Sequence, residues 1–319
     1  MIYLIIFLGL LIAELIYFRL ANHYNIIDKP NQRSSHTKIV LRGGGIIFSI
    51  SLLAYFFIHH FEYPWFVLGL ATIAGISFAD DVKPQSSKLR LILQIISVAI
   101  LLYQLYVLQL FYSQFTVAII AFISILFFVN AYNFMDGING LTASYSFTVL
   151  ASLFYLNSQL KIFDNDAIIY LALGNLVFFI FNFRKNAKCF AGDVGSVAMA
   201  FSLLFFTAGI ICKTGSFIFI LLFAVYGVDA GLTIFYRLLK RENIFNAHRQ
   251  HLYQYLSNEM RWPQLSVSLI YAGLQAIISF GACLLWQKSC RIQTVFIISV
   301  LFCLAIVYIL GKRYILKIK

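Results

Sequence analysis

Long runs of apolar residues make up most of the chain, and short polar segments separate them. A helix needs about 20 mostly apolar residues to cross a hydrocarbon core of about 30 Å. The pattern therefore predicts an all-α fold, a polytopic bundle of about eleven transmembrane helices with ten as the alternative. The predicted helices cover residues 2–20, 43–60, 64–79, 89–108, 114–132, 138–156, 166–183, 194–212, 216–236, 264–287 and 292–311.

Composition agrees with a membrane protein. The chain is 61% hydrophobic and only 11% charged, whereas a soluble domain carries about 25% charged residues. The first apolar run has no basic segment before it and ends at Glu14 and Arg19, which suits a first membrane helix better than a signal peptide. No repeat or long linker divides the sequence, so we expect a single membrane-embedded domain over residues 1–319.

The net charge of +12 reflects topology more than a nucleic-acid partner. Twenty of the 24 lysines and arginines lie in the segments that follow odd-numbered helices or in the C-terminal tail. Basic loops stay in the cytoplasm. We therefore expect the N-terminus outside, the C-terminus in the cytoplasm and the polar clusters on the cytoplasmic face. The remaining basic residues are Lys161, Lys213, Lys288 and Arg291.

Two adjacent carboxylates, Asp80 and Asp81, end the third predicted helix. They lie at the negative end of the helix dipole, so a cation must offset them. Lys83 and Lys88 are the structural candidates for this role. A bound divalent metal or a proton-transfer role is the functional alternative.

A second cluster closes the fifth predicted helix. Asn130, Asn133 and Asp136 follow at intervals of three and form one polar stripe. Helix-to-helix hydrogen bonding is the structural alternative. However, polar side chains at membrane depth are costly and usually functional.

The eighth predicted helix opens with the segment Gly192–Ser196, which contains Asp193. Asp193 could be an N-cap. Alternatively, it could ligate a metal beside helix amides that favour phosphate.

Two further groups lie on the same predicted face. His248, Arg249 and His251 belong to the longest loop and could bind phosphate, orient a substrate or ligate metal, or simply form an interfacial helix. The first loop holds Arg33 and Arg42, which suit phosphate oxygens, before the glycine run 43–45.

Asp229 is predicted to lie roughly 10 Å inside the ninth helix. A carboxylate at that depth is a functional candidate, and pairing with Arg237 or a neighbouring helix is the alternative. Together, the carboxylates, basic groups and glycine loops are the parts that phosphoryl transfer needs.

In this order the motifs resemble the polyprenyl-phosphate N-acetylhexosamine-1-phosphate transferases. The similar segments are Asp80-Asp81, the asparagine- and aspartate-rich run 130–141, Gly192–Ser196 and His248–His251. The resemblance spans roughly residues 28–254. It implies a bundle of ten or eleven helices with a cytoplasmic cleft and Mg²⁺ as cofactor, with Mn²⁺ able to substitute.

The resemblance also implies site roles. Asp193 matches the principal metal ligand, with Asp136 beside it. Asp80 and Asp81 match an essential pair, one of them a candidate base on the lipid phosphate. Asn133 and Asp136 match residues that organise nucleotide and metal. Residues expected to bind substrate are Asn130, Asn133, His248, Arg249, His251, Arg42, Arg33, Lys188 and Asp229.

The sequence departs from the family at two of these motifs. Many members have Asp where this chain has Asn139, and Asn186-Ala187-Lys188 replaces Pro-Ala-Lys. The Arg-Ser-Ser-His segment at 33–36 and the histidine loop resemble members that initiate O-antigen more than the peptidoglycan enzyme.

The reaction that the resemblance implies is transfer of an N-acetylhexosamine 1-phosphate from a UDP-sugar to undecaprenyl phosphate in the bacterial inner membrane. UMP would leave, and the product would initiate a lipid-linked glycan such as O-antigen. The oligomeric state stays open, with a homodimer among the alternatives. A secondary transporter for an anionic solute and an inactive scaffold that binds polyprenyl phosphate are the rival hypotheses.

Overall fold

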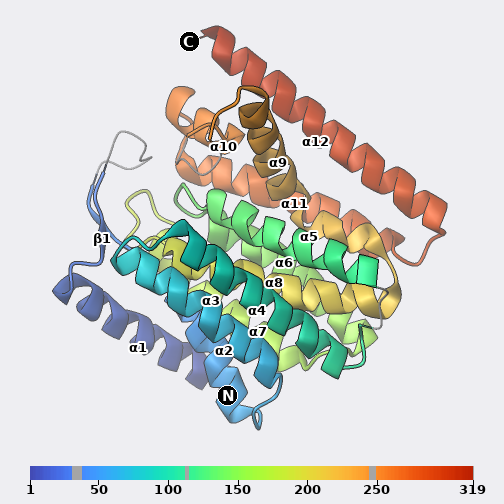
Figure 1. The fold of residues 1–319 in the computed structure, drawn as a ribbon. Helices are drawn as coiled ribbons and strands as arrows, with labels where there is room; N and C mark the ends of the chain where they lie inside the picture. The colour runs from blue at the N-terminus through green and yellow to red at the C-terminus, as the bar shows by residue number, and fades with distance from the viewer. Residues whose placement is uncertain (31–37, 112–114, 244–248, 319) are drawn as a thin grey trace.

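The computed structural model describes residues 1–30, 38–111, 115–243 and 249–318, and helices form most of this part of the chain (Figure 1). In chain order its helical segments are α1 (Ile2–His23), α2 (Ile46–Ile58), α3 (Pro64–Val82), α4 (Ser87–Val107), α5 (Phe115–Phe134), α6 (Leu141–Leu160), α7 (Asn165–Asn182), α8 (Gly192–Thr214), the 3₁₀ segment η1 (Phe217–Phe223), α9 (Ala224–Leu239), α10 (Leu252–Gln254), the π-helical turn η2 (Tyr255–Glu259), α11 (Gln264–Leu285) and α12 (Cys290–Ile318).

The prediction of an all-α, multi-pass membrane protein is confirmed. Each of the eleven predicted runs coincides with a helix, and the run 216–236 begins as η1 before it continues into α9. In the described chain, nine helical segments are long and apolar enough to cross a membrane. The two predicted runs outside this set are α2, with 13 residues, and α6, whose sequence is rich in serine and threonine.

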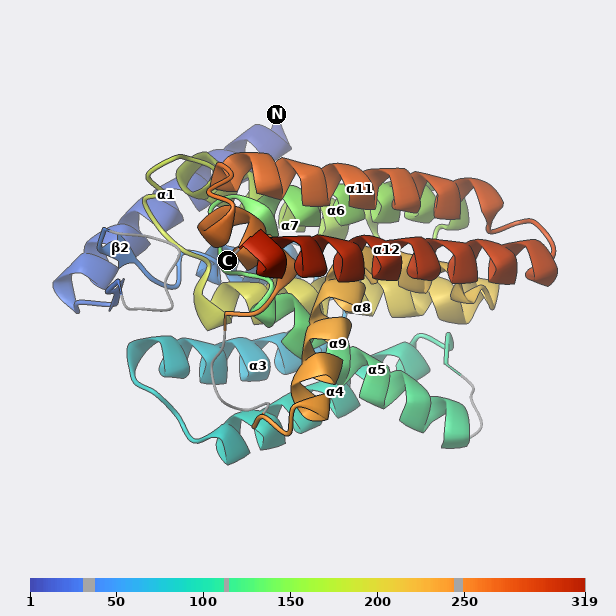
Figure 2. The same cartoon turned by 90° about the horizontal axis from the view of Figure 1, so that it is seen from above.

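Helix α8 forms the centre of the bundle. Of the residues in its most apolar stretch, 89% are buried, against 6% in α12. Figure 2 shows α3, α4 and α5 on one side of α8, and α6, α11 and α12 on the other. A membrane helix buried on all sides needs protein neighbours around its whole circumference, whereas α12 is left to face lipid.

Glycines allow α2 to approach α8 at the level of the backbone. A Cβ on Gly195 would lie 2.5 Å from the Cα of Gly45. The amide of Gly44 donates to the Phe190 carbonyl, and that of Gly45 donates to Ala191. The glycine run 43–45 therefore packs one loop against the start of α8 and does not stand open as an anion cradle.

A short hairpin that the sequence did not predict precedes these glycines. Strands β1 (Ile27–Asp28) and β2 (Val40–Leu41) pair antiparallel. Leu41 also forms a parallel bridge to Cys189, and its carbonyl accepts from the Phe190 amide at 2.8 Å. Arg42 directly follows β2, so the hairpin determines the position of the Arg42 guanidinium group.

We predict opposite effects of the same substitution at two helical glycines. Gly195→Ala places a methyl group against the Gly45 backbone and should destabilise the protein by about 1–3 kcal/mol. Gly75→Ala in α3 meets nothing within 4 Å and should stabilise by up to about 1 kcal/mol through helix propensity. Thermal unfolding in one detergent compares them, and equal shifts would contradict the packing argument.

Candidate active site

Asp81 connects the end of α3 to the start of α8. Its side chain is fully buried, and its two oxygens accept from the amides of Asp193 and Val194, each at 2.9 Å. The N-cap of α8 is Ala191, which offers no side-chain acceptor, so Asp81 caps α8 from another helix. The N-cap alternative for Asp193 is therefore wrong, and these two amides, expected to attract phosphate, are already occupied.

Two arginines neutralise the aspartates of this cluster. Arg42 Nε lies 2.6 Å from Asp81 Oδ1, and its Nη2 lies 3.4 Å from Asp193 Oδ1. On the other side, Arg90 Nη1 lies 2.9 Å from Asp80 Oδ2 and 3.4 Å from Asp193 Oδ2. The side chain of Asp193, 23% exposed, thus lies between two guanidinium groups.

The expected cations were different ones. Lys83 and Lys88 were the structural candidates, whereas the structure pairs the aspartates with Arg42 and Arg90. Arg90 was not among the cations predicted for this role. Its position in the first turn of α4, just after the Asp80-Asp81 pair, was the available signal. The sequence alone does not indicate which of Lys83, Lys88 and Arg90 pairs with the aspartates, because all three follow them within ten residues.

The asparagine motif meets the same point. Asn133, near the end of α5, donates to Asp193 Oδ1 at 3.2 Å and to Ser196 Oγ at 2.9 Å. Asn130 lies one turn earlier and donates instead to Gln94 and to the carbonyl of its own helix at Leu126. Motifs that are up to 151 residues apart therefore converge on one carboxylate.

Asp136 lies just after α5, beside this cluster. It accepts a hydrogen bond from Thr142 at 2.5 Å. Burial raises the pKa of Asp136 to about 7 although the Thr142 bond opposes the shift, and the charges of Asp193 and Asp81 add to the increase. A cation at this point would favour the ionised form.

The donor set suits a hard divalent cation. Asp80, Asp81, Asp136 and Asp193 carry two more charges than Arg42 and Arg90 neutralise when all are ionised. Carboxylate and amide oxygens are what Mg²⁺ prefers. A cation at Asp193 competes with the two arginines, because each contacts one of its oxygens.

The histidine loop is organised by Asp229. This buried carboxylate contacts His251 Nδ1 at 3.2 Å, accepts from Tyr271 at 2.7 Å and accepts from the amide of Leu252 at 3.1 Å. Asp229 is thus paired with neighbouring segments, which was the structural alternative predicted for it. His251 is 1% exposed and is the N-cap residue of α10.

The same loop reaches the end of α5. Tyr253 donates to the carbonyl of Phe134 at 3.0 Å, so the Asp229 network fixes the loop against the residues just before Asp136. Arg249 is half-buried, and its Nε makes no hydrogen bond within the described residues. His248 and Arg33, both predicted to bind substrate, lie outside the described residues.

The lining of a cavity of about 780 Å³ includes Leu41, the residue before Arg42, and Phe190, three residues before Asp193. This cavity lies between the β1–β2 hairpin and the loop that precedes α8. Lys188 is exposed there, next to the pair formed by Leu41 and Phe190. The polar residues that line the cavity include Lys38, Asn139, Lys185, Asn186, Lys188 and Gln264.

Asn139 has a structural reason to be an amide. Its Nδ2 donates to the carbonyls of Arg184 and Lys185 at 2.9 and 3.3 Å. An ionised aspartate would direct an oxygen at both carbonyls and lose these bonds. Asn139, which differs from the residue of many family members, therefore holds residues 184–185 in place beside the cavity.

The fold and the site together define a helical membrane protein with a cluster of aspartates and arginines at one end of its bundle. Residues 63–213 match the sequence model of glycosyl transferase family 4. This match, over slightly less than half of the chain, confirms the resemblance to the polyprenyl-phosphate hexosamine-1-phosphate transferases.

Individual relatives agree with this assignment. The chain is 26% identical to a probable undecaprenyl-phosphate N-acetylglucosaminyl 1-phosphate transferase of Bacillus subtilis, over 94% of this chain and 88% of that protein. It is 30% identical to a phospho-N-acetylmuramoyl-pentapeptide-transferase of Thermotoga neapolitana, over 48% of this chain and 49% of that protein. A transferase of the same name from Carboxydothermus hydrogenoformans is 29% identical over 47% of this chain and 46% of that protein.

The adjacent aspartates should respond differently to neutralisation. Asp81→Asn retains one acceptor where two amides and Arg42 need two, and should cost about 1–3 kcal/mol of stability. Asp80→Asn should leave thermal unfolding nearly unchanged while activity falls, since Asp80 accepts from the Gln85 amide and from Arg90 at the edge of the cluster and caps no helix of the core. Equal losses of stability would contradict the division of roles.

Restoring the common family residue should not help this chain. Asn139→Asp should destabilise by about 1–3 kcal/mol, because it removes two donated hydrogen bonds and adds a charge facing carbonyls. Asn186→Asp, an exposed amide in the same region, is the matched control. Thermal unfolding and turnover measure both, and a more active and equally stable Asn139→Asp protein would refute this explanation.

Proposed function

We propose that this protein transfers N-acetylhexosamine 1-phosphate from a UDP-sugar to undecaprenyl phosphate, releasing UMP and initiating a lipid-linked glycan such as O-antigen. The convergence of Asp80, Asp81 and Asn133 with two arginines on Asp193 supports this reaction most directly. Such a site combines charge neutralisation with fixed geometry, which is what phosphoryl transfer demands.

The bond changes are simple. An oxygen of the lipid phosphate attacks the phosphorus that bears the sugar, and the bond from that phosphorus to the UMP oxygen breaks. UMP departs with the electron pair, and a polyprenyl diphosphate sugar remains. No covalent bond to the protein forms in this scheme, so the side chains act by binding, orienting and neutralising.

The exposure and the contacts of each charged side chain in the aspartate site suggest its role. Asp80 and Asp193 are partly exposed, so they face incoming phosphates, whereas Asp81 is fully buried. Arg42 and Arg90 can exchange a carboxylate oxygen for a phosphate oxygen of the same charge. Asp80, acting through its free lone pairs, would take up any proton still held by the lipid phosphate.

The donor would occupy the polar cavity beside the hairpin. A volume of about 780 Å³ lies in the range typical of small-molecule sites. Lys38, Lys185 and Lys188 supply positive charge for a diphosphate. Because Leu41 lines this cavity and immediately precedes Arg42, the donor phosphates would end near Asp193.

Mg²⁺, with Mn²⁺ as a substitute, is proposed as the cofactor. Asp193 and Asp136 would hold it, and when bound it would supply charge neutralisation for the diphosphate. We also propose that this face of the bundle lies in the cytoplasm, since basic loops follow the helices that end here.

Asp193→Asn tests the assignment. Release of UMP from a panel of UDP-N-acetylhexosamines should require undecaprenyl phosphate and Mg²⁺, and it should fall at least about 100-fold in this variant. Glu62→Gln, an exposed carboxylate at the other end of α3, should retain activity. Normal turnover by Asp193→Asn would refute the role of Asp193.

Absence of UMP release with every donor, from folded wild-type protein, would refute the transferase proposal itself. In that case, lipid binding without turnover would favour the scaffold. Uptake of an anionic solute into vesicles would favour the transporter.

A further inference from the structure

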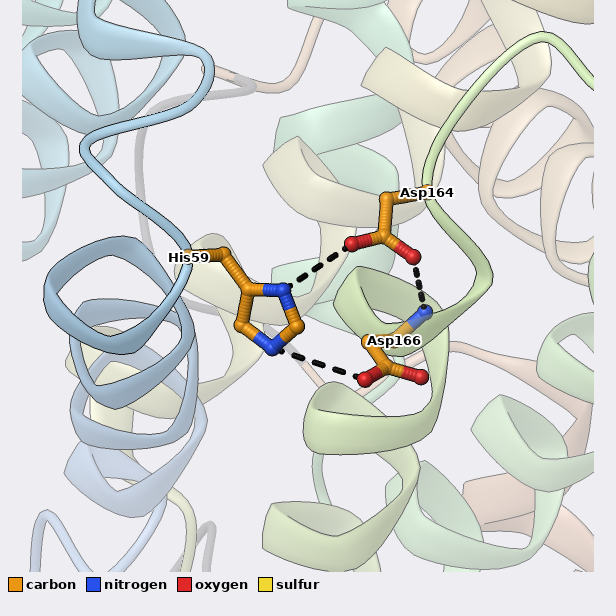
Figure 3. A group of neighbouring side chains, drawn as sticks. All are labelled: His59, Asp164 and Asp166. Carbon is orange, nitrogen blue, oxygen red and sulfur yellow. Dashed lines mark hydrogen bonds and ion pairs between the residues drawn. The ribbon is translucent and has the colours of Figure 1, made fainter.

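A second cluster of charged side chains lies far from the aspartates. His59 ends α2, and Asp164 and Asp166 stand at the start of α7 (Figure 3). Tyr63, which immediately precedes α3, accepts from the Asp164 amide at 2.9 Å. Helix α3 then runs 19 residues, about 28 Å, to the Asp80-Asp81 end. The cluster is therefore at the opposite face of the bundle.

The imidazole lies between the two carboxylates. Figure 3 shows one ring nitrogen directed at each aspartate. Nδ1 is 3.1 Å from Asp164 Oδ2, and Nε2 is 3.4 Å from Asp166 Oδ2. A neutral imidazole has one N–H, so it can donate to only one of them. The other contact then sets a nitrogen lone pair against a carboxylate oxygen.

The carboxylates are oriented by other groups. Asp164 Oδ1 accepts from the Asp166 amide at 3.0 Å, and Asp166 Oδ1 accepts from Tyr3 at 2.8 Å. Each aspartate thus has Oδ1 occupied by a donor and turns Oδ2 towards His59, and Asp164 Oδ2 also accepts from Tyr55 at 3.1 Å. Hydrogen bonds that orient a ligand carboxylate and hold an imidazole ring in place are typical of metal sites.

Charge also requires a cation. Within the described residues, His59 is the only basic side chain within 4.0 Å of either aspartate. Glu62 adds a third carboxylate nearby, bonded to Tyr55, which also donates to Asp164. An imidazolium would offset one negative charge of the aspartate pair, and a divalent ion would offset two.

We propose that His59 Nε2 and Asp166 bind one divalent first-row transition-metal ion, such as zinc, at the face opposite the aspartate site, while Asp164 orients the imidazole from Nδ1. Ligand atoms of these three residues lie within 4.8 Å of one another. Tetrahedral zinc with bonds of about 2.0–2.2 Å separates its ligands by roughly 3.3–3.5 Å, which matches the 3.4 Å between Nε2 and Asp166 Oδ2.

The assignment of the ring nitrogen follows from its partners. Nε2 is buried and makes no hydrogen bond within the described residues. It is the ligand, while Nδ1–H donates to Asp164 and holds the ring. An imidazole in the set favours zinc, nickel or copper over Mg²⁺. The ion would connect the end of α2 to the start of α7 and, through Tyr3, to α1.

Bound metal is the direct test. Full-length protein, purified without a histidine tag and stripped by a chelator, is equilibrated with micromolar ZnCl₂ and excess Mg²⁺. The Mg²⁺ occupies oxygen-only carboxylate sites elsewhere. Elemental analysis after gel filtration should find about one zinc per chain. Co²⁺ in place of zinc should give a visible absorption band.

Three variants make the result specific. His59→Gln and Asp166→Asn should each lose the zinc equivalent and the Co²⁺ band. Asp166→Asn can still accept from Tyr3, so it guards against a folding defect in His59→Gln. His60→Gln changes the exposed neighbouring histidine and should bind zinc like the wild type.

Equal zinc in the wild type and both site variants would overturn the proposal. So would a wild type that binds no zinc. Activity enters none of these readouts, so failure here would leave the transferase proposal untouched.

Discussion

The buried carboxylate of Asp81 is the interaction on which the arrangement of the aspartate site depends. It satisfies two amides that α8 leaves open and at the same time receives the guanidinium of Arg42. An isolated buried carboxylate would be costly, whereas one with two amide donors and an arginine is stable. Because α8 is the central helix, this single group sets the position of α3 and the first loop relative to the core.

The same interaction separates two adjacent residues that look equivalent in sequence. Asp81 faces inward and organises the backbone, while Asp80 lies at the edge and pairs with Arg90. Consecutive helical residues point about 100° apart, so one can be structural and its neighbour reactive. Asp193 then lies between the arginines because Asp81 has fixed the first turn of its helix.

Much of the fold was predictable because a bilayer imposes a length and a composition on every crossing helix. The polar motifs also identified Asp80, Asn133 and Asp193, which do meet. The sequence could not show which cation neutralises them, since Lys83, Lys88 and Arg90 all follow Asp80 within ten residues and Arg42 comes from a distant loop. Nor could it reveal the hairpin, the cap supplied by a different helix, or the buried place of His251. Those features depend on contacts between segments far apart in sequence.

Chemical modification of the Cys189 thiol can report whether the first loop is packed against the start of α8. The Cys189 backbone bridges Leu41 of the hairpin and accepts from Asn182, its side chain is fully buried, and burial raises the pKa of the thiol well above its usual range. While the hairpin is seated, an alkylating reagent has neither access to this sulfur nor a thiolate to attack. The rate at which Cys189 is modified therefore measures how often the first loop leaves the start of α8, without any label being introduced.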